Sequence, residues 1–588
     1  MNNRSYRPVG PDPRSRRTPG TGAGYPPGVS EPGAAPAPPG GAVRLLRRPL
    51  LLLAAVAVAF LALGLRQAWS DAPTYDEPIY LSSGVTALTF HDLRLNPEQP
   101  PLAKAVAALP VLAARPVVPR GPAWDSADEH AYSVAFVQAQ LQAGRLRLEV
   151  FLARLVPLLE AVGVAFVLYA LCTRLFARRC GLLAGVVWLV DPFVLGLGHL
   201  DGVDLPLTLA TVLVSWAVLE VLREPGRRQL AVAGLACAGA VLAKDDGVLV
   251  ALSAGAVVVA AGWRTAGWRV LGRLGLMAVV AWAAVWLCYL ALDPATVRHL
   301  AVLPEPFLIG VRYLGSHDTV GAPAYLLGSS WVGGRWWYWP VSLVVKVPIL
   351  TVALLLVGPL GLRLVGRTAR RETLAVAVVP GVVLAVFTAV SPKDVGLRYL
   401  LPVLALWVVV ASPAALIAGR TAVRVALAAV VAVAAVTVAW SLPDSLAFVN
   451  PPFTPAYRSV SNSDVDWGQG FWLLRSWSAG RRPWVAYFGQ GLGPADVAGA
   501  RSMLTDVPGV APTVVVPARA LTGWVAVSAT ALTSNNAAQL SYLRAYCPVG
   551  VLGGSILLYR FATPPTPTAG PAVPTAVCPG AFSHRVTG

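Results

Sequence analysis

The sequence predicts a mainly α-helical protein that crosses a membrane about eleven times. Three observations lead to this fold class. First, 56% of the 588 residues are hydrophobic and only 13% are charged, which is more apolar surface than a soluble core can bury. Second, apolar runs of about 17–25 residues, the length needed to cross a bilayer, recur along the chain. Third, arginines gather in short clusters between these runs.

The hydrophobic pattern indicates eleven spans. They are expected at 49–67, 151–173, 180–197, 204–222, 229–244, 247–263, 270–292, 341–362, 373–391, 398–418 and 422–441. The fifth and sixth are short and share the turn Lys244-Asp245-Asp246-Gly247.

The formal net charge of +18 could indicate a nucleic-acid partner, but the basic residues do not form one patch. Instead, arginines occupy alternate loops, which is the pattern of cytoplasmic loops in membrane proteins. The short loops 198–203, 244–247 and 392–397 contain two lysines and no arginine. We therefore expect no nucleic acid, a cytoplasmic N-terminus in the cell membrane, and segments 68–150, 293–340 and 442–588 outside.

Composition divides the chain into four parts. Residues 1–43 are rich in Pro, Gly and Arg and are expected to be a disordered cytoplasmic tail. Residues 44–441 form the multispanning domain, whose first outer loop is 68–150. Residues 442–563 alternate strand-like runs with Gly/Pro turns, which predicts a small α/β domain. Residues 564–588 are a loose Pro/Thr/Ala-rich tail, and a Cys547–Cys578 disulfide is consistent with an outer location.

Acidic residues concentrate in the first outer loop, directly after the first span, at Asp71, Asp76, Glu77 and Glu98. A carboxylate can act as a general base that takes a proton from an attacking hydroxyl or amine. The adjacent pair Asp76-Glu77 is the first candidate. Because Pro78 follows, the same pair also suits the start of a helix, and the two interpretations are compatible.

Two further acidic positions lie on the same side. Glu98 precedes Pro100 and Pro101, which predicts an extended, fixed backbone, and Lys104 follows in the first turn of a helix. This lysine is a candidate for binding phosphate. Asp204 begins the fourth span, where an acid implies a cation, a sugar or a nearby basic residue. Turn and cap roles remain alternatives for all of them.

Basic candidates on the outer side are Lys346, just inside the eighth span, and Arg398, at the start of the tenth. A lysine in an apolar span either snorkels to the surface or meets an anion. A guanidinium is well suited to bind phosphate. His199 and His317 are the histidines best placed for a metal ion.

The ordered motifs resemble those of a known family. The run Asp76-Glu77-Pro-Ile-Tyr80, then Gly84, then Asn96-Pro-Glu98-Gln-Pro-Pro-Leu-Ala-Lys104, resembles the first outer loop of glycosyltransferase family 39. This family of C-type membrane transferases includes protein O-mannosyltransferases and lipid A aminoarabinose transferases. Further matches are Asp204-Leu-Pro206, Tyr325-Leu-Leu-Gly328 with Gly334 to Tyr338, Lys346-Val-Pro348 and Gly396-Leu-Arg398-Tyr399-Leu-Leu-Pro402. The run Ser461-Asn-Ser-Asp464-Val-Asp466-Trp467-Gly468-Gln469 resembles the Asp-Trp-Gly-Gln motif of many bacterial members. Ser463 and Val465 depart slightly from the usual last motif.

The resemblance implies the C-type fold and an inverting transfer of a sugar from a polyprenyl-phosphate donor. The acceptor would be a protein Ser/Thr, an envelope glycan or a lipid. Asp76, beside Glu77, would be the catalytic base. Substrate-binding residues would be Glu98, Lys104, Asp204, Lys346, Arg398 and Tyr399. In aminoarabinose transferases the residue matching Glu98 contributes to a metal site, which makes a divalent metal possible, with His317 as the second ligand.

The main alternative is a transporter or flippase of lipid-linked sugars, and a third is an inactive sugar-binding or wall-assembly scaffold. Transporters usually carry charges at the middle of the membrane and show internal repeats. In this sequence the charges gather at the outer ends of the spans and no repeat is visible. Both features favour the enzyme.

Overall fold

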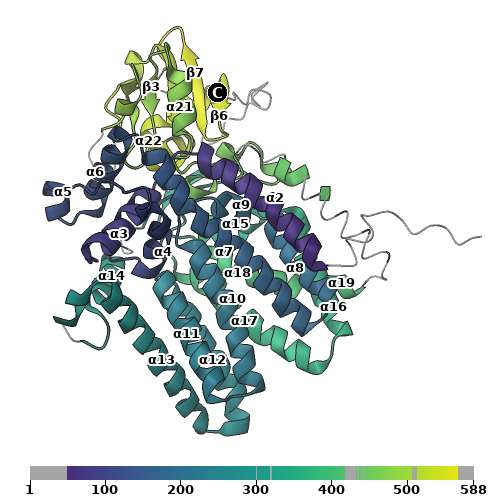
Figure 1. Ribbon diagram of the computed structural model, residues 1–588. Coiled ribbons are helices and arrows are strands. Elements are labelled where there is room, and N and C mark those ends of the chain that lie inside the picture. Colours follow the sequence, from purple (N-terminus) through teal and green to yellow (C-terminus); the bar gives the residue numbers. More distant parts are fainter. Residues whose placement is uncertain are drawn as a thin grey trace, which may run out of the picture.

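The computed structural model describes residues 49–298, 301–317, 321–417, 444–505 and 513–566, with scattered positions between 418 and 443. A body of long helices carries a smaller lobe with a β-sheet at one end (Figure 1). The expected tails, 1–43 and most of 564–588, lie outside the described residues.

The helical body is built from apolar helices and two bent pairs. The long helices are α2 (Pro49–Ser70), α7 (Leu146–Leu175), α10 (Asp204–Arg223), α11 (Arg227–Ala243), α12 (Gly247–Ala266), α13 (Arg269–Leu292) and α17 (Arg367–Val390). A 3-10 turn η3 (Leu397–Leu400) leads into α18 (Leu401–Ala411) and α19 (Ala414–Ile417). Helices α8 (Arg178–Leu189) and α9 (Pro192–Gly198) meet at 61°, and α15 (Tyr338–Lys346) and α16 (Ile349–Gly361) at 111°.

Within the described residues, seven helices are long and apolar enough to cross a membrane, or nine if each bent pair is one span. The prediction of a mainly helical membrane protein is therefore confirmed, whereas the count of eleven is not. The expected fifth span corresponds to α11, a helix of 17 residues that falls short of this length. The expected eleventh, 422–441, lies mostly outside the described residues.

The segment expected as the first outer loop, 68–150, folds into short helices, α3 (Glu77–Phe90), α4 (Pro101–Leu112), α5 (Pro122–Asp125) and α6 (Glu129–Gln142). Prolines stand in the first turn of α3 and α4, where a missing N–H costs nothing. At Gly84, a Cβ would lie 2.2 Å from the carbonyl oxygen of Lys104. The glycine thus allows α3 and α4 to pack closely. This packing fixes the start of α3, beside Asp76, relative to the start of α4, which follows Glu98.

The later segments that are expected outside form a helix, a hairpin and the lobe. Helix α14 (Glu305–His317) follows η1 (Pro294–Arg298), and β1 (Pro323–Leu326) pairs antiparallel with β2 (Ser329–Val332). The lobe has a five-stranded sheet in the order β4-β3-β5-β7-β6, in which β3 is parallel to β4 and β5. Its strands are β3 (Trp484–Ala486), β4 (Arg501–Ser502), β5 (Gly523–Ser528), β6 (Gly550–Leu552) and β7 (Ile556–Phe561).

Short helical pieces complete the lobe. They are α21 (Phe471–Ser478), α22 (Ala537–Leu540), η4 (Pro451–Phe453), η5 (Ala456–Arg458), η6 (Asn462–Asp464), η7 (Pro494–Asp496), η8 (Ala518–Ala520), the π-helical turn η9 (Ala531–Asn535) and η10 (Ser541–Ala545). Cys547 is disulfide-bonded, and its expected partner Cys578 lies outside the described residues.

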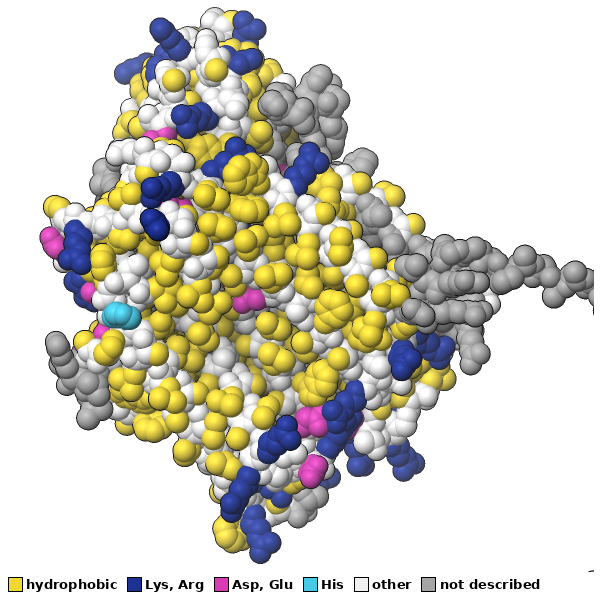
Figure 2. Space-filling view, in the orientation of Figure 1, with side chains coloured by type: hydrophobic (Ala, Val, Ile, Leu, Met, Phe, Trp, Pro, Cys, Tyr) yellow, Lys and Arg dark blue, Asp and Glu magenta, His cyan; other side chains and the backbone are white. Residues whose placement is uncertain are grey.

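A shared apolar core joins the first outer loop to the lobe. Buried residues of α3 and α6, such as Val85 and Phe136, belong to the same cluster as Phe471 and Val485 of the lobe. The body has its own larger core. Figure 2 shows apolar side chains across the middle of one face, with Lys and Arg at the lower end of the helical body and again over the lobe at the top and on the left side. An apolar band between charged ends matches a body that lies in a membrane.

Candidate functional site

Asp76 stands at the start of α3, but its carboxylate does not cap the helix. Instead, Oδ2 accepts a hydrogen bond from Nη1 of Arg398 at 2.7 Å and lies 3.3 Å from the hydroxyl of Tyr80. The two side chains are mostly buried, with exposed fractions of 17% for Asp76 and 10% for Arg398. The first acidic motif and the tenth apolar run therefore meet at one ion pair.

The turn before Arg398 is held by the lobe. Gly396 has φ +126°, a conformation that favours glycine, and a Cβ there would lie 2.0 Å from Oγ of Ser463. The next amide, of Leu397, donates to the carboxylate of Asp464 at 2.9 Å. The motifs around residues 396 and 464 thus act together to position Arg398.

The Arg398 guanidinium is enclosed by aromatic rings. Its Cζ lies 4.3 Å from the ring centroid of Trp467 and 5.1 Å from that of Tyr399. Its Nε is buried and has no hydrogen-bond partner among the described residues. Because a buried donor without a partner is costly, this N–H is a ready site for an oxygen of an anionic substrate group.

A second carboxylate–cation pair lies beside the first. Asp204, the first residue of α10, accepts from Nζ of Lys244 at 3.0 Å, and its Oδ2 is 3.9 Å from Nη1 of Arg398. Nζ of Lys244 also lies 3.8 Å from the ring centroid of Tyr399. The structure therefore brings together the expected residues Asp76, Asp204, Arg398 and Tyr399, and it adds Lys244.

A pair of carboxylates forms the acidic side of the site. Nδ2 of Asn96 lies 3.3 Å from Oε1 of Glu98 and 3.1 Å from Oε2 of Glu129, the first residue of α6. Burial, with the charges of Glu129 and Asp76 nearby, raises the pKa of Glu98 to about 7. Burial also raises the pKa of Glu129. Sequence reasoning missed Glu129, although the run Asp128-Glu129-His130 in an outer loop was a usable signal.

Glu77 is buried in a network rather than open to a substrate. Its carboxylate accepts from Nε and Nη2 of Arg154 at 2.7 and 2.6 Å and from the amides of Thr74 and Asp201 at 2.7 and 2.6 Å. Arg154 also donates to three carbonyl oxygens, of Ala68, Asp71 and Ala72. This network fixes the loop that ends in Asp76. Arg154 was another missed residue, signalled by a charge inside an apolar span.

The two lysines expected to bind phosphate donate instead to backbone carbonyls. Nζ of Lys104 donates to the carbonyl oxygens of Asn96 and Gln99 at 2.6 and 2.7 Å and to Oδ1 of Asn96 at 3.0 Å. Burial lowers its pKa to about 7. Nζ of Lys346 donates to the carbonyl oxygens of Leu446 and Asp464 at 2.7 and 2.5 Å. Both lysines therefore hold the segments on which site residues stand.

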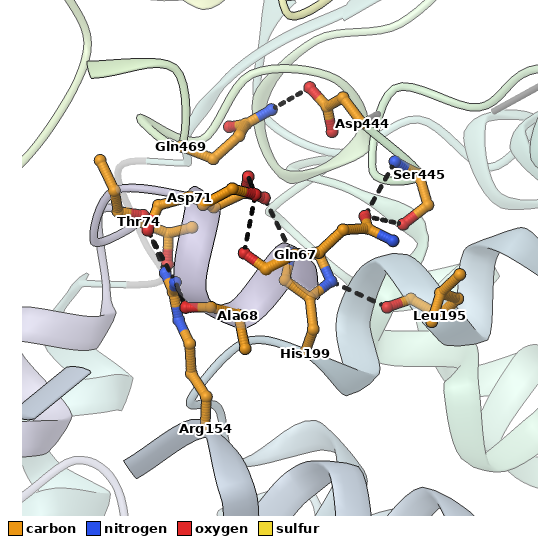
Figure 3. Close-up of polar contacts among 12 residues, drawn as sticks. Gln67, Ala68, Asp71, Thr74, Arg154, Leu195, His199, Asp444, Ser445 and Gln469 are labelled. Carbon is orange, nitrogen blue, oxygen red and sulfur yellow. Dashed lines mark hydrogen bonds and ion pairs between the residues drawn. The ribbon is translucent and has the colours of Figure 1, made fainter. Parts of the chain in front are cut away.

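Another polar cluster surrounds Asp71 and His199 (Figure 3). Nε2 of His199 is 2.9 Å from Oδ2 of Asp71, and Nδ1 contacts the carbonyl oxygen of Leu195 at 2.8 Å. Close by, Gln469 donates to Asp444 at 3.0 Å. The cluster ties the end of α2 to α9 and to the Asp-Trp-Gly-Gln motif, so His199 has a structural partner.

The predicted metal site can be assessed in part. At Gly310 of α14, a Cβ would lie 2.0 Å from the carbonyl oxygen of Pro97, so this helix packs against the turn that carries Glu98. His317 is the last residue of α14, and its side chain lies outside what the structure describes. In the described part of the chain, no three His, Cys, Asp or Glu side chains form a group that could hold a metal.

Residues 142–293 match the family model described as dolichyl-phosphate-mannose-protein mannosyltransferase. The match spans α7 to α13 and includes Asp204 and Lys244. This match over residues 142–293 confirms the resemblance to glycosyltransferase family 39 that the motifs indicate. A search of curated proteins finds no match.

The comparison with solved structures finds similar chains at low identity. ArnT from Cupriavidus metallidurans bound to undecaprenyl phosphate is 18% identical, with 69% of this chain and 67% of that chain covered, at a TM-score of 0.46. The oligosaccharyltransferase AglB from Archaeoglobus fulgidus, in complex with an inhibitory peptide and a dolichol-phosphate, is 14% identical, with 68% and 55% covered, at 0.42. The S. cerevisiae protein O-mannosyltransferase Pmt1-Pmt2 complex is 15% identical, with 47% and 38% covered, at 0.28.

Proposed function

We propose that the protein is a membrane glycosyltransferase that moves a sugar from a polyprenyl-phosphate donor to an acceptor on the outer face of the cytoplasmic membrane. The observation that carries the proposal is the Asp76–Arg398 ion pair with Asp204 and Lys244 alongside it. The site combines a carboxylate that can take a proton with cations that can bind a phosphate. The description of the matching family, dolichyl-phosphate-dependent mannosyl transfer, supports a lipid-phosphate donor.

In the proposed reaction, Asp76 takes the proton of the acceptor's hydroxyl or amine as that atom attacks the anomeric carbon of the sugar. The new bond forms on the face opposite the phosphate, and the bond from carbon to phosphate oxygen breaks, so the configuration inverts. The leaving polyprenyl phosphate departs as an anion and needs no proton. Arg398, through an Nε that has no hydrogen-bond partner in the described part of the chain, and Lys244 stabilise that anion.

The remaining residues divide into substrate-binding and positioning groups. Glu98 and Glu129 offer acceptors for sugar hydroxyls, and Tyr399 and Trp467 offer ring faces beside Arg398. Glu77, Lys104 and Lys346 hold the loops that carry the site. A divalent metal would have Glu98 and His317 as ligands. Since the described residues supply no three-ligand group, no step is assigned to it.

The test is a transfer assay with the full-length protein in proteoliposomes. Polyprenyl-phosphate sugars with a radiolabelled sugar are supplied together with envelope acceptors from a strain that lacks the protein. The donor and acceptor are first identified from the lipid-linked sugar that accumulates in that strain and the glycan, glycoprotein or lipid that loses its sugar. Labelled acceptor supports the proposal. Movement of the lipid-linked sugar across the bilayer without transfer would instead support a flippase.

A further inference from the structure

A recess lies on the lobe side of the protein, apart from the Asp76–Arg398 site. It has a volume of about 380 Å³, counted with the solvent at its mouth. The hairpin strand β1, the turn η5 and the lobe elements η9, η10 and β7 all contribute to it. Its lining residues are Tyr325, Tyr457, Arg458, Leu532, Thr533, Arg544, Tyr546, Pro548, Leu557 and Tyr559. It shares no lining residue with the Asp76–Arg398 site.

The lining of this recess is basic. Two guanidinium groups and four phenol rings line it, and the lining contains no carboxylate. Arg544 is only 9% exposed, and its Nη2 donates to the carbonyl oxygen of Leu532 at 2.9 Å. Its Cζ lies 5.5 Å from the ring centroid of Tyr325. Arg544 is therefore a fixed positive charge at the wall of the recess.

Arg458 is the second positive charge, and its donors are less occupied. Its Nε is buried and has no hydrogen-bond partner within the described ranges. The hydroxyl of Tyr457, a residue that is 7% exposed, lies beside the Arg458 side chain. The backbone at this point is fixed, because the carbonyl of Arg458 accepts from the Tyr325 hydroxyl at 2.7 Å. A buried guanidinium N–H that has no partner among the described residues is costly unless a ligand satisfies it, and the Tyr457 hydroxyl beside it can share that ligand.

We propose that this recess binds an oxyanion such as a phosphate group, held by Arg458 and the Tyr457 hydroxyl beside the charge of Arg544. A guanidinium binds phosphate oxygens through its fork of N–H donors, and a phenol O–H is a further donor. The phosphate is either free or part of the acceptor. Only the second source depends on the proposed transferase function.

The first arm of the test uses inorganic phosphate and the full-length protein in a neutral detergent. Phosphate is titrated at constant ionic strength against sodium chloride, and binding is measured by tyrosine and tryptophan fluorescence. The wild type should bind saturably. Arg458→Gln should weaken binding at least tenfold, and Tyr457→Phe by about threefold. Arg560→Gln is the matched control, since Arg560 also lies over an aromatic ring of the lobe, 5.3 Å from the centroid of Trp524. It should bind as the wild type does.

The thermal midpoint of each variant without phosphate shows whether it folds. If Arg458→Gln unfolds, Arg458→Lys takes its place and should weaken binding by a smaller factor, because it keeps the charge and loses the fork of donors. Absence of saturable phosphate binding by the wild type overturns the proposal. Equal affinities of the wild type and the folded Arg458 variant overturn it as well.

The second arm identifies the source of the phosphate. If the acceptor supplies it, free phosphate should raise the KM for the acceptor and leave kcat unchanged, and Arg458→Gln should do the same. If free phosphate is the ligand, the Arg458 variant should lose phosphate binding with no change in the KM for the acceptor. Because the first arm does not need activity, a failure of the transferase proposal and a failure of this proposal give different results.

Discussion

The Nη1 atom of Arg398 lies 2.7 Å from Oδ2 of Asp76, across 322 positions of sequence. This ion pair joins the proposed base to the proposed phosphate-binding cation. It also explains why the carboxylate is free of the helix-capping role that its sequence position suggests, since Asp76 makes no side-chain cap. The orientation of one residue therefore depends on the other.

Removal of the guanidinium should affect both parts of the site. We expect Arg398→Gln to lower kcat/KM at least 100-fold, because the leaving phosphate loses its donors and Asp76 loses its orientation. Arg398→Lys should recover only part of the lost kcat/KM, since a single ammonium group cannot replace the fixed set of N–H donors of a guanidinium. The assay is transfer from the polyprenyl-phosphate donor. Arg94→Gln, which breaks the more exposed pair with Asp92, is the control and should remain active.

Glu77 should contribute to stability more than to chemistry. Glu77→Gln leaves the fully buried charge of Arg154 without a carboxylate to balance it. This should lower the free energy of unfolding by about 3–5 kcal/mol. The measurement is the free energy of unfolding in detergent. Asp92→Asn, in the partly exposed pair with Arg94, should change it by no more than about 1 kcal/mol. Similar effects of the two substitutions would contradict the positioning role of Glu77.

Asp444 should make stability depend on pH. Burial and the charge of Asp71 raise its pKa from 3.8 to about 7, against the smaller opposing effects of Gln469 and His199. Between about pH 4 and 7 the folded protein therefore binds more protons at this group than the unfolded chain, so its contribution to stability falls as the pH rises. Asp444→Asn should remove a slope of up to about 1.4 kcal/mol per pH unit in that range.

This pH dependence is measured from the free energies of unfolding of the wild type and of Asp444→Asn at pH 5 and pH 7. The wild type should lose more stability over this interval than Asp444→Asn. Parallel losses in the two proteins would show that Asp444 ionises near its ordinary pKa in the fold.

Lys346 should hold the lobe rather than bind the donor. Lys346→Met removes the ammonium group that donates hydrogen bonds to the carbonyl oxygens of Leu446 and Asp464. We expect faster proteolysis of the segment around 444–470, with the KM for the donor changed less than threefold. A large rise in that KM with unchanged proteolysis would return Lys346 to the phosphate-binding role that its sequence position suggested.

The helices could be predicted from the sequence because length and composition decide whether a segment crosses a membrane. The bends could not. Pro192 is the first residue of α9, and Pro348 stands just before α16. Both prolines lie inside runs that were expected as single spans, and each marks the bend of its helix pair. A proline marks where a helix can bend, but the angles of 61° and 111° depend on the neighbouring helices that pack there.

The residue types of the site were also predictable, but their partners were less so. Asp76 and Arg398 were expected on one face, and they form an ion pair. Lys104 was expected to bind phosphate and Lys346 to snorkel to the surface or meet an anion, and each donates to carbonyl oxygens. The sequence does not show which backbone carbonyls come within reach of an ammonium group. Glu129 and Lys244 were missed because only the fold brings their loops to the site.

The most direct test of the account compares the wild type with Asp76→Asn in proteoliposomes that contain the polyprenyl-phosphate donor and the acceptor. Asparagine keeps the shape and can still contact Arg398, but it cannot take a proton. The account predicts a kcat at least 100-fold lower, in the range typical for loss of a general base, with the affinity for the donor changed less than fivefold. Transfer at the wild-type rate by Asp76→Asn would contradict it.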